Sequence, residues 1–304
     1  MHGQACALRQ AELRKRRLEF ARGPAHMTLV SFLIALGVVV LVVAVTVAGL
    51  AGPTLARLWR RQRIARRPFP AAWRDIVRRR VPLARELPAA HRLRLKKHIQ
   101  VLLAEVPFIG CAGLEISDEM RVTIAAQAAF LLLGRGGSFG NVREVLVYPG
   151  HFVVPRSEAG AGGVVHEGRD VLAGQSWQRG QVIVAWDAVR DGAADPHDGA
   201  NVVIHEFAHQ LDQDTGAANG APYVGRGALQ QGWARVMNQE FDALRARLAR
   251  AEPGLIEPYA ATSPAEFFAV TSELFFERPD ALAAERPALH EQLKSCYRLD
   301  PAAW

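Results

Sequence analysis

An uncharged apolar stretch near the N-terminus places the strongest constraint on what this chain can fold into. From Thr28 to Ala56 there is no charged residue, and TLVSFLIALGVVVLVVAVTVAGL is apolar almost throughout. A helix needs about 20 mainly apolar residues to cross a bilayer, and a core helix of a soluble protein would carry a polar stripe that is missing here. A cleaved signal peptide, with small residues at Gly49–Ala51, is the alternative, but its apolar region is only ~7–15 residues long. The sequence therefore predicts one transmembrane helix over 28–50, in contact with the lipid bilayer.

The excess of basic charge is confined to the part of the chain around this stretch. Residues 1–100 carry 21 Lys and Arg against 4 Asp and Glu, whereas residues 101–304 carry 16 against 26. No basic motif interleaved with aromatic residues occurs, so the charge predicts no nucleic-acid partner. The three cysteines, Cys6, Cys111 and Cys296, lie far apart and form no C-x-x-C pair, which favours a reducing compartment.

Basic residues flank the apolar stretch on both sides. The C-terminal flank holds Arg57, Arg60, Arg61, Arg63, Arg66 and Arg67, and the N-terminal flank holds Arg14, Lys15, Arg16, Arg17 and Arg22. The positive-inside rule leans toward a cytoplasmic C-terminal part, and it becomes decisive if translation starts at Met27 instead of Met1. We therefore predict a single-pass protein of the inner (cytoplasmic) membrane with its folded domain in the cytoplasm. The arginines of 57–80 either lie on anionic lipid or form a solvated linker.

The remaining sequence predicts an α+β domain with a short sheet. The predicted organisation is a tail over 1–27, the membrane helix over 28–50, a basic linker over 51–81 and a folded domain over 82–304. Helices are predicted over 83–106, from Ser117 to about Leu133, and over 226–250, 263–277 and 279–297. Strands rich in β-branched residues are predicted over 142–149 and 181–189, with a glycine-rich loop over 157–170 between them.

A pair of histidines in NVVIHEFAHQLD, residues 201–212, indicates metal chemistry. On a helix, His205 and His209 lie on one face and direct two imidazoles to one place, with Glu206 beside it. H-E-x-x-H is the spacing at which a helix offers two nitrogen ligands to zinc and a carboxylate to the water on the metal. The motif therefore predicts one Zn²⁺ per chain.

A catalytic zinc usually has a third protein ligand. A third histidine six residues after His209 is excluded because Thr215 occupies that position. On the predicted helix 263–277, Glu266 and Glu273 lie on one face, and the spacing alone does not separate them. Glu266 also completes a capping box with Ser263. If Glu273 is not the ligand, it either is a solvated residue or braces the motif helix by accepting a hydrogen bond.

Asp212 lies on the same face of the motif helix as the two histidines. It either accepts a hydrogen bond from the ring of a ligating histidine or caps the end of the helix.

Four separated motifs together resemble one family. NVVIHEFAHQLD, LVYPGHFVV (146–154), AGQSWQRGQVIVAW (173–186) and YAATSPAEFFAVTSELFF (259–276) resemble the Mlc titration factor A family of bacterial zinc metallopeptidases, over roughly residues 85–300. The resemblance implies a zincin-like fold of the gluzincin type with an H-E-x-x-H active-site helix. It implies zinc held by His205, His209 and Glu266, Glu206 as general base and a catalytic role for Tyr259. It also implies a transcriptional-regulator partner, whereas the anchor and the basic linker depart from the family's soluble members.

The function predicted from these features is zinc-dependent hydrolysis of peptide bonds in a peptide or protein substrate. Water activated by the metal would attack, with Glu206 as its base. If the strand over 181–189 is an edge strand, an extended substrate could pair with it. The alternative is a membrane-tethered binding protein that sequesters a regulatory partner, with peptidase activity secondary or lost. A closed structural zinc site would need a fourth protein ligand, and no Cys or His is placed to supply it, which favours the enzyme.

Overall fold

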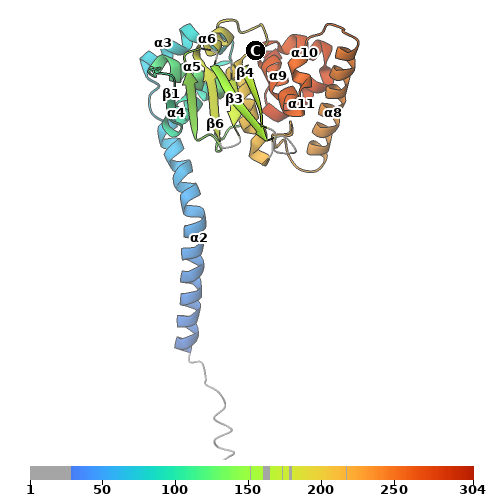
Figure 1. Ribbon diagram of the computed structural model, residues 1–304. Coiled ribbons are helices and arrows are strands. Elements are labelled where there is room, and N and C mark those ends of the chain that lie inside the picture. The colour runs from blue at the N-terminus through green and yellow to red at the C-terminus, as the bar shows by residue number, and fades with distance from the viewer. Residues whose placement is uncertain (1–28, 151, 160–164, 173, 178–179, 217) are drawn as a thin grey trace, which may run out of the picture. The chain divides into compact units, whose positions relative to one another are not determined.

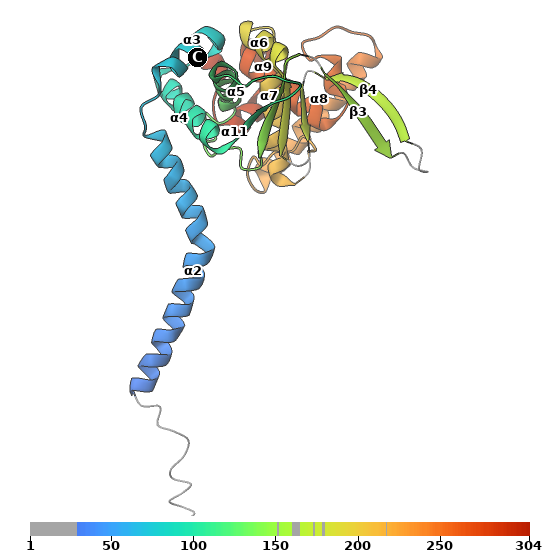
Figure 2. The same cartoon turned by 60° about the vertical axis from the view of Figure 1, so that its left-hand side comes forward.

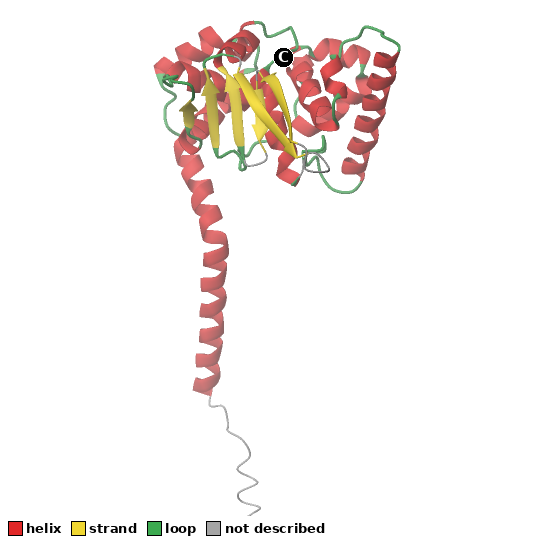
Figure 3. Ribbon diagram, viewed as in Figure 1, coloured by secondary structure: helices red, strands yellow, loops and turns green. Residues whose placement is uncertain are grey.

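Helices predominate in this protein, and the strands form one small sheet and one hairpin (Figure 3). The computed structural model describes residues 29–150, 152–159, 165–172, 174–177, 180–216 and 218–304 (Figure 1). The chain divides into two units, residues 1–60 and 61–304. The predicted mixed fold with a short sheet is confirmed at this level, and the predicted tail over 1–27 lies outside the described residues.

Helix α2 (Leu29–Ala65) contains the uncharged stretch from Leu29 onward. Within the described residues it is the one helix long and apolar enough to cross a membrane, with a mean hydropathy of 2.9 over its most apolar window. Between Phe32 and Leu50 its large apolar side chains are about half exposed or more, from Leu36 at 49% to Leu50 at 78%. The hydroxyl of Thr46 donates to the carbonyl oxygen of Val42 within the helix, so it needs no water. These properties are compatible with a membrane anchor.

The segment predicted as a basic linker, 51–81, is mostly helical. Helix α2 continues to Ala65, and α3 (Ala71–Arg80) follows after a short turn. Arginine is a good helix former, and α3 also turns an apolar side inward, where Ile76 is buried and Trp73 and Val77 pack against the core. Helix propensity and burial of this apolar side together explain the helical structure.

The sheet has the strand order β1-β2-β6-β5. Strands β1 (Phe108–Gly110), β2 (Glu144–Tyr148) and β6 (Gln181–Ala185) are parallel, and β5 (Gly174–Trp177) runs antiparallel to β6. Alternate residues of β2 and β6 point to one face and are fully buried there: Val145, Val147, Val182 and Val184. This face joins the main core, which fixes the register because a shift of one residue would turn all four valines to the opposite face of the sheet and out of this core.

Helices from both halves of the second unit contribute to the same core. Helix α5 (Asp118–Phe130) connects β1 to β2 and buries nine consecutive residues from Val122 onward. Helix α7 (Val202–Asp212) packs against α5, α9 (Pro264–Glu277), β5 and β6. The other elements that surround the core are η1 (Pro82–Arg85), α4 (Ala89–Glu105), α6 (Trp186–Ala194), α8 (Ala228–Ala249), α10 (Pro279–Glu285) and α11 (Pro287–Tyr297).

Three local predictions differ from the structure. The strand predicted over 181–189 ends at Ala185, and α6 follows directly. Most of the loop predicted over 157–170 belongs to a hairpin of β3 (Phe152–Ala159) and β4 (Val165–Leu172), which extends away from the helices in Figure 2. The helix predicted over 279–297 is broken into α10 and α11 before Pro287, because proline has no N–H to continue a helix but suits the first position of a new one.

The substrate-pairing hypothesis required the strand over 181–189 to be an edge strand. Strand β6 is not an edge strand. It lies between β2 and β5, so both of its edges are already paired. The edge next to α7 belongs to β5.

The close approach of Gly134 to the C-terminal segment gives a test of this packing. A Cβ at Gly134 would lie 2.2 Å from the carbonyl oxygen of Tyr297 and 2.4 Å from that of Arg298. Backbone carbonyls cannot rotate away as side chains do, so we expect Gly134→Ala to destabilise the protein by ~1–3 kcal/mol or more. Urea unfolding of the full chain in detergent, followed by tryptophan fluorescence, measures this. Gly140→Ala is the control, because nothing lies within 4 Å of its Cβ position. Equal midpoints for the two variants would contradict this packing.

Candidate metal centre

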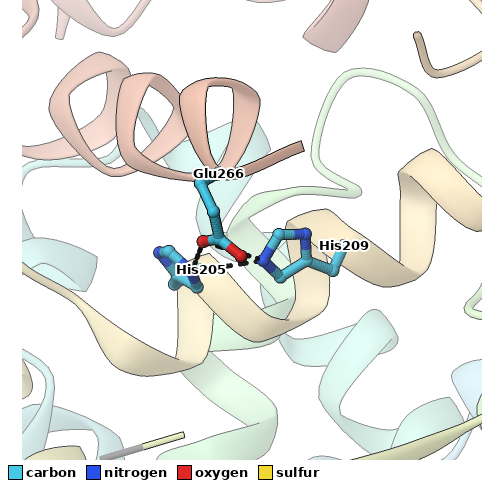
Figure 4. Close-up of side chains that lie close together, drawn as sticks. All are labelled: His205, His209 and Glu266. Carbon is cyan, nitrogen blue, oxygen red and sulfur yellow. Dashed lines mark hydrogen bonds and ion pairs between the residues drawn. The ribbon is translucent and has the colours of Figure 1, made fainter. Parts of the chain in front are cut away.

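Helix α7 carries the H-E-x-x-H residues on a rigid support. Asn201 caps its start, where the side-chain oxygen accepts a hydrogen bond from the backbone N–H of Ile204 at 3.0 Å. One side of the helix is fully buried, and the Phe207 ring packs edge-on against Phe139 with centroids 4.7 Å apart. With this side fixed in the core, the imidazoles of His205 and His209 project from the opposite face toward α9 (Figure 4).

Helix α9 brings the acidic partner. Ser263 caps its start by accepting the backbone N–H of Glu266 at 3.2 Å, and Pro264 occupies the first helical position. The buried phenylalanines of α9 hold it in the core: Phe267, Phe268, Phe275 and Phe276. Glu266 therefore projects from the first turn of α9 onto the two histidines of α7 (Figure 4).

Three potential ligand atoms converge between α7 and α9. Glu266 Oε2 lies 2.9 Å from His205 Nε2 and 3.4 Å from His209 Nε2, and the two Nε2 atoms lie 3.2 Å apart. Neighbouring ligands of a tetrahedral zinc, with bonds of ~2.0–2.1 Å, lie about 3.3 Å apart. The three atoms thus have the spacing of one face of such a tetrahedron, and two imidazoles with one carboxylate are a set that zinc accepts. No second cluster of at least three such groups occurs in the part of the chain that the structure describes.

The charges around His205 also favour a cation. Its Nδ1 lies 2.8 Å from Glu273 Oε1, so the ring stands between two carboxylates. Burial lowers the pKa of His205, but the hydrogen bonds with Glu266 and Glu273 outweigh burial and raise it well above its usual value. Burial would raise the pKa of Glu266, but its hydrogen bonds with both histidines lower it. The cluster therefore stabilises positive charge, whether a proton or a metal ion carries it.

Glu206 is a buried carboxyl beside this cluster. It is 3% exposed, and its Oε2 has no hydrogen-bond partner among the described residues. Burial raises the pKa of Glu206 to about 8, although the charge of His205 lowers it. A buried, unpartnered oxygen next to a ligand set fits a group that handles protons.

Tyr259 lies close to His205. It belongs to the short helix η3 (Pro258–Ala261), which packs against α8 and α9 and contains the fully buried Ala260. The Tyr259 ring is 6.1 Å from the His205 ring between centroids, and the residue is 53% exposed. Its position beside the ligand set and its exposure allow it to meet a substrate.

A buried chain of polar groups lies behind His205, and its continuation from Asn201 to Glu277 was not predicted. Glu273 Oε2 accepts the backbone N–H of Asn201, and Asn201 Nδ2 donates to Glu277 Oε1 at 2.9 Å. Burial raises the pKa of Glu277 to about 9, although its hydrogen bond with Asn201 lowers it. Two sequence signals were available: an asparagine directly before the motif helix, and a glutamate one turn after Glu273 on the same face. Glu273 thus connects Nδ1 of His205 to the capped start of α7.

Asp212 binds the loop that follows α7. It is fully buried, and its two oxygens accept the backbone N–H groups of Gly220 at 2.7 Å and Ala221 at 2.8 Å. The carbonyl of Gly220 in turn accepts the indole N–H of Trp233 at 2.9 Å. Asp212 therefore fastens the loop after α7 to the core.

Comparison with known proteins identifies the family. The family described as glucose-regulated metallo-peptidase M90 matches this chain over residues 56–298. The chain belongs to this family. Similar proteins include the Synechocystis protein slr2042, named as uncharacterized, which is 40% identical over 245 residues (80% of this chain and 89% of the relative). Proteins named Mlc titration factor A from Yersinia pestis and Yersinia pseudotuberculosis are 32% identical over 237 residues (77% of this chain and 86% of theirs). The resemblance inferred from the four motifs is thereby confirmed.

The unequal positions of Glu266 and Glu273 predict unequal effects on metal content. Glu266→Ala removes an atom of the converging set, so we expect this variant to purify nearly free of zinc. Glu273→Ala removes a partner of a ligand, a loss that typically weakens metal binding by about 10–100-fold, so zinc should persist at saturating metal. Elemental analysis of both variants, with circular dichroism to verify folding, makes the comparison. The reverse ranking would assign the ligand to Glu273.

Proposed function

We propose that this protein is a zinc-dependent peptidase that hydrolyses peptide bonds with Glu206 as general base. The observation that carries the proposal is the convergence of His205, His209 and Glu266, with the buried carboxyl of Glu206 beside them. Membership of a metallo-peptidase family supports it. The proposed fold type is zincin-like, with α7 as its active-site helix and a gluzincin set of ligands.

Each residue of the site has a proposed role in the reaction. His205, His209 and Glu266 would hold one Zn²⁺, which when bound makes water a stronger nucleophile and polarises the carbonyl of the substrate. Glu206 accepts the proton of the attacking water at Oε2 and returns it to the leaving amine. The hydroxyl of Tyr259 donates to the developing oxyanion, an interaction that is stronger in the transition state than in the substrate.

Of the two histidines, Glu273 forms a hydrogen bond with His205 only. By accepting the hydrogen on Nδ1, it leaves the lone pair of Nε2 directed at the site, which is the orientation that a ligand needs. Asn201 holds Glu273 in turn through its backbone N–H.

The substrate class in this proposal is an extended peptide or an unfolded segment of a protein. Strand β5 replaces β6 as the strand for substrate pairing, because β5 is an edge of the sheet and packs beside α7. An extended segment added to this edge forms main-chain hydrogen bonds without requiring one particular sequence.

A second candidate function is binding of a regulator. The relatives from Yersinia are named Mlc titration factor A, a name that points to titration of the Mlc regulator. If this chain has the same activity, it is a membrane-tethered protein that sequesters a transcriptional regulator, and its peptidase activity is secondary or lost. Stable capture of a regulator by a protein that cleaves no peptide distinguishes it from the peptidase.

Glu206→Gln tests the peptidase mechanism. Glutamine keeps the shape of the side chain but cannot take a proton, so we expect normal zinc content and loss of peptide cleavage by at least ~10²-fold. Digestion of a peptide library, read by mass spectrometry, measures the activity of the full chain. Glu115→Gln is the matched control, since Glu115 is exposed and far along the chain from the ligands. Cleavage by the Glu206 variant at the parent rate would show that the mechanism is wrong.

The proposed location is the inner membrane, with α2 crossing once over 28–50 and the peptidase domain, residues 82–304, in the cytoplasm. The excess of arginine after the apolar stretch supports this orientation. Protease added to sealed spheroplasts should leave the domain intact and should digest it only after lysis. Immunoblotting for the C-terminal part reads the result, and digestion in sealed spheroplasts would reverse the orientation.

A further inference from the structure

A cavity of about 250 Å³ between α3, η1 and α4 combines an apolar floor with a basic rim. The floor is formed by Phe69, Val77, Ala84, Leu95 and Ile99. The rim is formed by Arg74, Arg78, Arg85, Arg92 and Lys96. No acidic residue lines the cavity. Such a combination complements a ligand that has an anionic group joined to an alkyl chain.

Helices α3 and α4 contribute lining residues to the cavity at the same sequence spacing. Helix α3 presents Arg74 and Arg78 one turn apart with Val77 between them, and α4 presents Arg92 and Lys96 in the same way with Leu95 between them. Residues at i, i+3 and i+4 share one helix face. Both helices therefore turn a face of two cations and one aliphatic residue toward the same cavity.

Most of the positive charge on the rim is not neutralised within the protein. Arg78 is paired with Asp75 at 3.0 Å, and the Arg85 guanidinium donates to the carbonyl oxygen of Arg78. Arg74, Arg92 and Lys96 form no ion pair with another described residue. Concentrated cations without carboxylate partners are the electrostatic complement of a phosphate group.

The segment that precedes Phe69 is held against α4 by side-chain contacts. Gln100 Nε2 donates to the carbonyl oxygen of Arg67 at 3.1 Å, and Arg61 forms a bidentate ion pair with Glu105. Phe69 packs edge-on against Trp73, with ring centroids 5.9 Å apart. The floor and its approach are thus held in place by side-chain contacts.

We propose that this cavity binds the phosphate headgroup and the first methylenes of an anionic phospholipid. Its volume is below the ~300–1,000 Å³ of pockets that enclose a whole drug-sized ligand, so it accommodates one end of a lipid while the chains stay in the bilayer. The charge-free stretch ends at Ala56, 13 residues before Phe69. Thirteen residues span at most about 45 Å, so insertion of α2 keeps the cavity close to lipid headgroups and raises their effective concentration. The raised effective concentration rests on the proposed membrane insertion of α2, whereas lipid binding in the cavity does not.

The test uses the full chain in a neutral detergent and measures lipid binding by native mass spectrometry. The probes are dioctanoyl phosphatidylglycerol, dioctanoyl phosphatidylcholine, glycerol 3-phosphate and a twelve-residue oligothymidylate. We expect phosphatidylglycerol to bind at least about tenfold more tightly than the other three, because it alone combines net negative charge with an alkyl chain. Equal binding of glycerol 3-phosphate would make the cavity an anion site only, and tighter binding of the oligonucleotide would make it a nucleic-acid site. Equal binding of phosphatidylcholine would exclude a role for the basic rim.

A matched pair of double variants locates the binding. Arg74→Gln/Arg92→Gln removes one rim cation from each helix, and Arg79→Gln/Lys97→Gln removes one cation from each helix outside the cavity. All four side chains are exposed, so both variants should fold, and their melting temperatures verify this. We expect the rim variant to lose about tenfold in affinity for phosphatidylglycerol and the control variant to lose less than about twofold. Equal losses would show a general attraction between charges and would overturn the assignment to this cavity.

Discussion

The packing of α7 against α9 is the contact on which the chemistry of this protein depends. The two helices are more than 50 residues apart in the sequence, and only their packing brings His205 between Glu266 and Glu273. Each helix is capped by a side chain at its start and held by aromatic residues in the core. A displacement of either helix by an ångström would separate ligand atoms that now lie 2.9–3.4 Å apart. The site therefore requires a core that holds both helices in fixed positions.

The site concentrates carboxyl groups where water is scarce. Glu206, Glu273 and Glu277 are each less than 10% exposed, and Glu266 projects into the same region. Burial of several like charges is unfavourable unless hydrogen bonds and positive charge compensate it. Asn201, the backbone at the start of α7 and the two imidazoles supply part of this compensation. A bound cation would supply more, and it would stabilise the folded state because the unfolded chain does not assemble these ligands.

The uneven distribution of charge along the chain corresponds to two different surfaces. The acidic part carries the candidate metal centre, whereas basic residues of α3, η1 and α4 surround an apolar cavity. In our proposals one surface acts on peptides and the other recognises the lipid in which α2 is anchored.

The sequence by itself determined what local periodicity and capping control. The uncharged stretch, the spacing of His205 and His209, and the Ser263 cap all specify helices through neighbours within a few residues, and those helices are present. The family was also recognisable from four motifs. Boundaries were less predictable: β6 gives way to α6 within one apolar run, and the basic segment after the anchor is helical.

Only the tertiary structure decided how distant elements meet. Glu266 and Glu273 were equivalent by spacing, but the packing of α9 turns one toward the Nε2 atoms of both histidines and the other toward Nδ1 of His205. The link from Asn201 to Glu277, the interior position of β6 and the cavity between α3 and α4 likewise depend on pairings over long sequence distances. The physical reason is that a helix specifies which residues share its face, whereas the neighbour of that face depends on how the whole core packs.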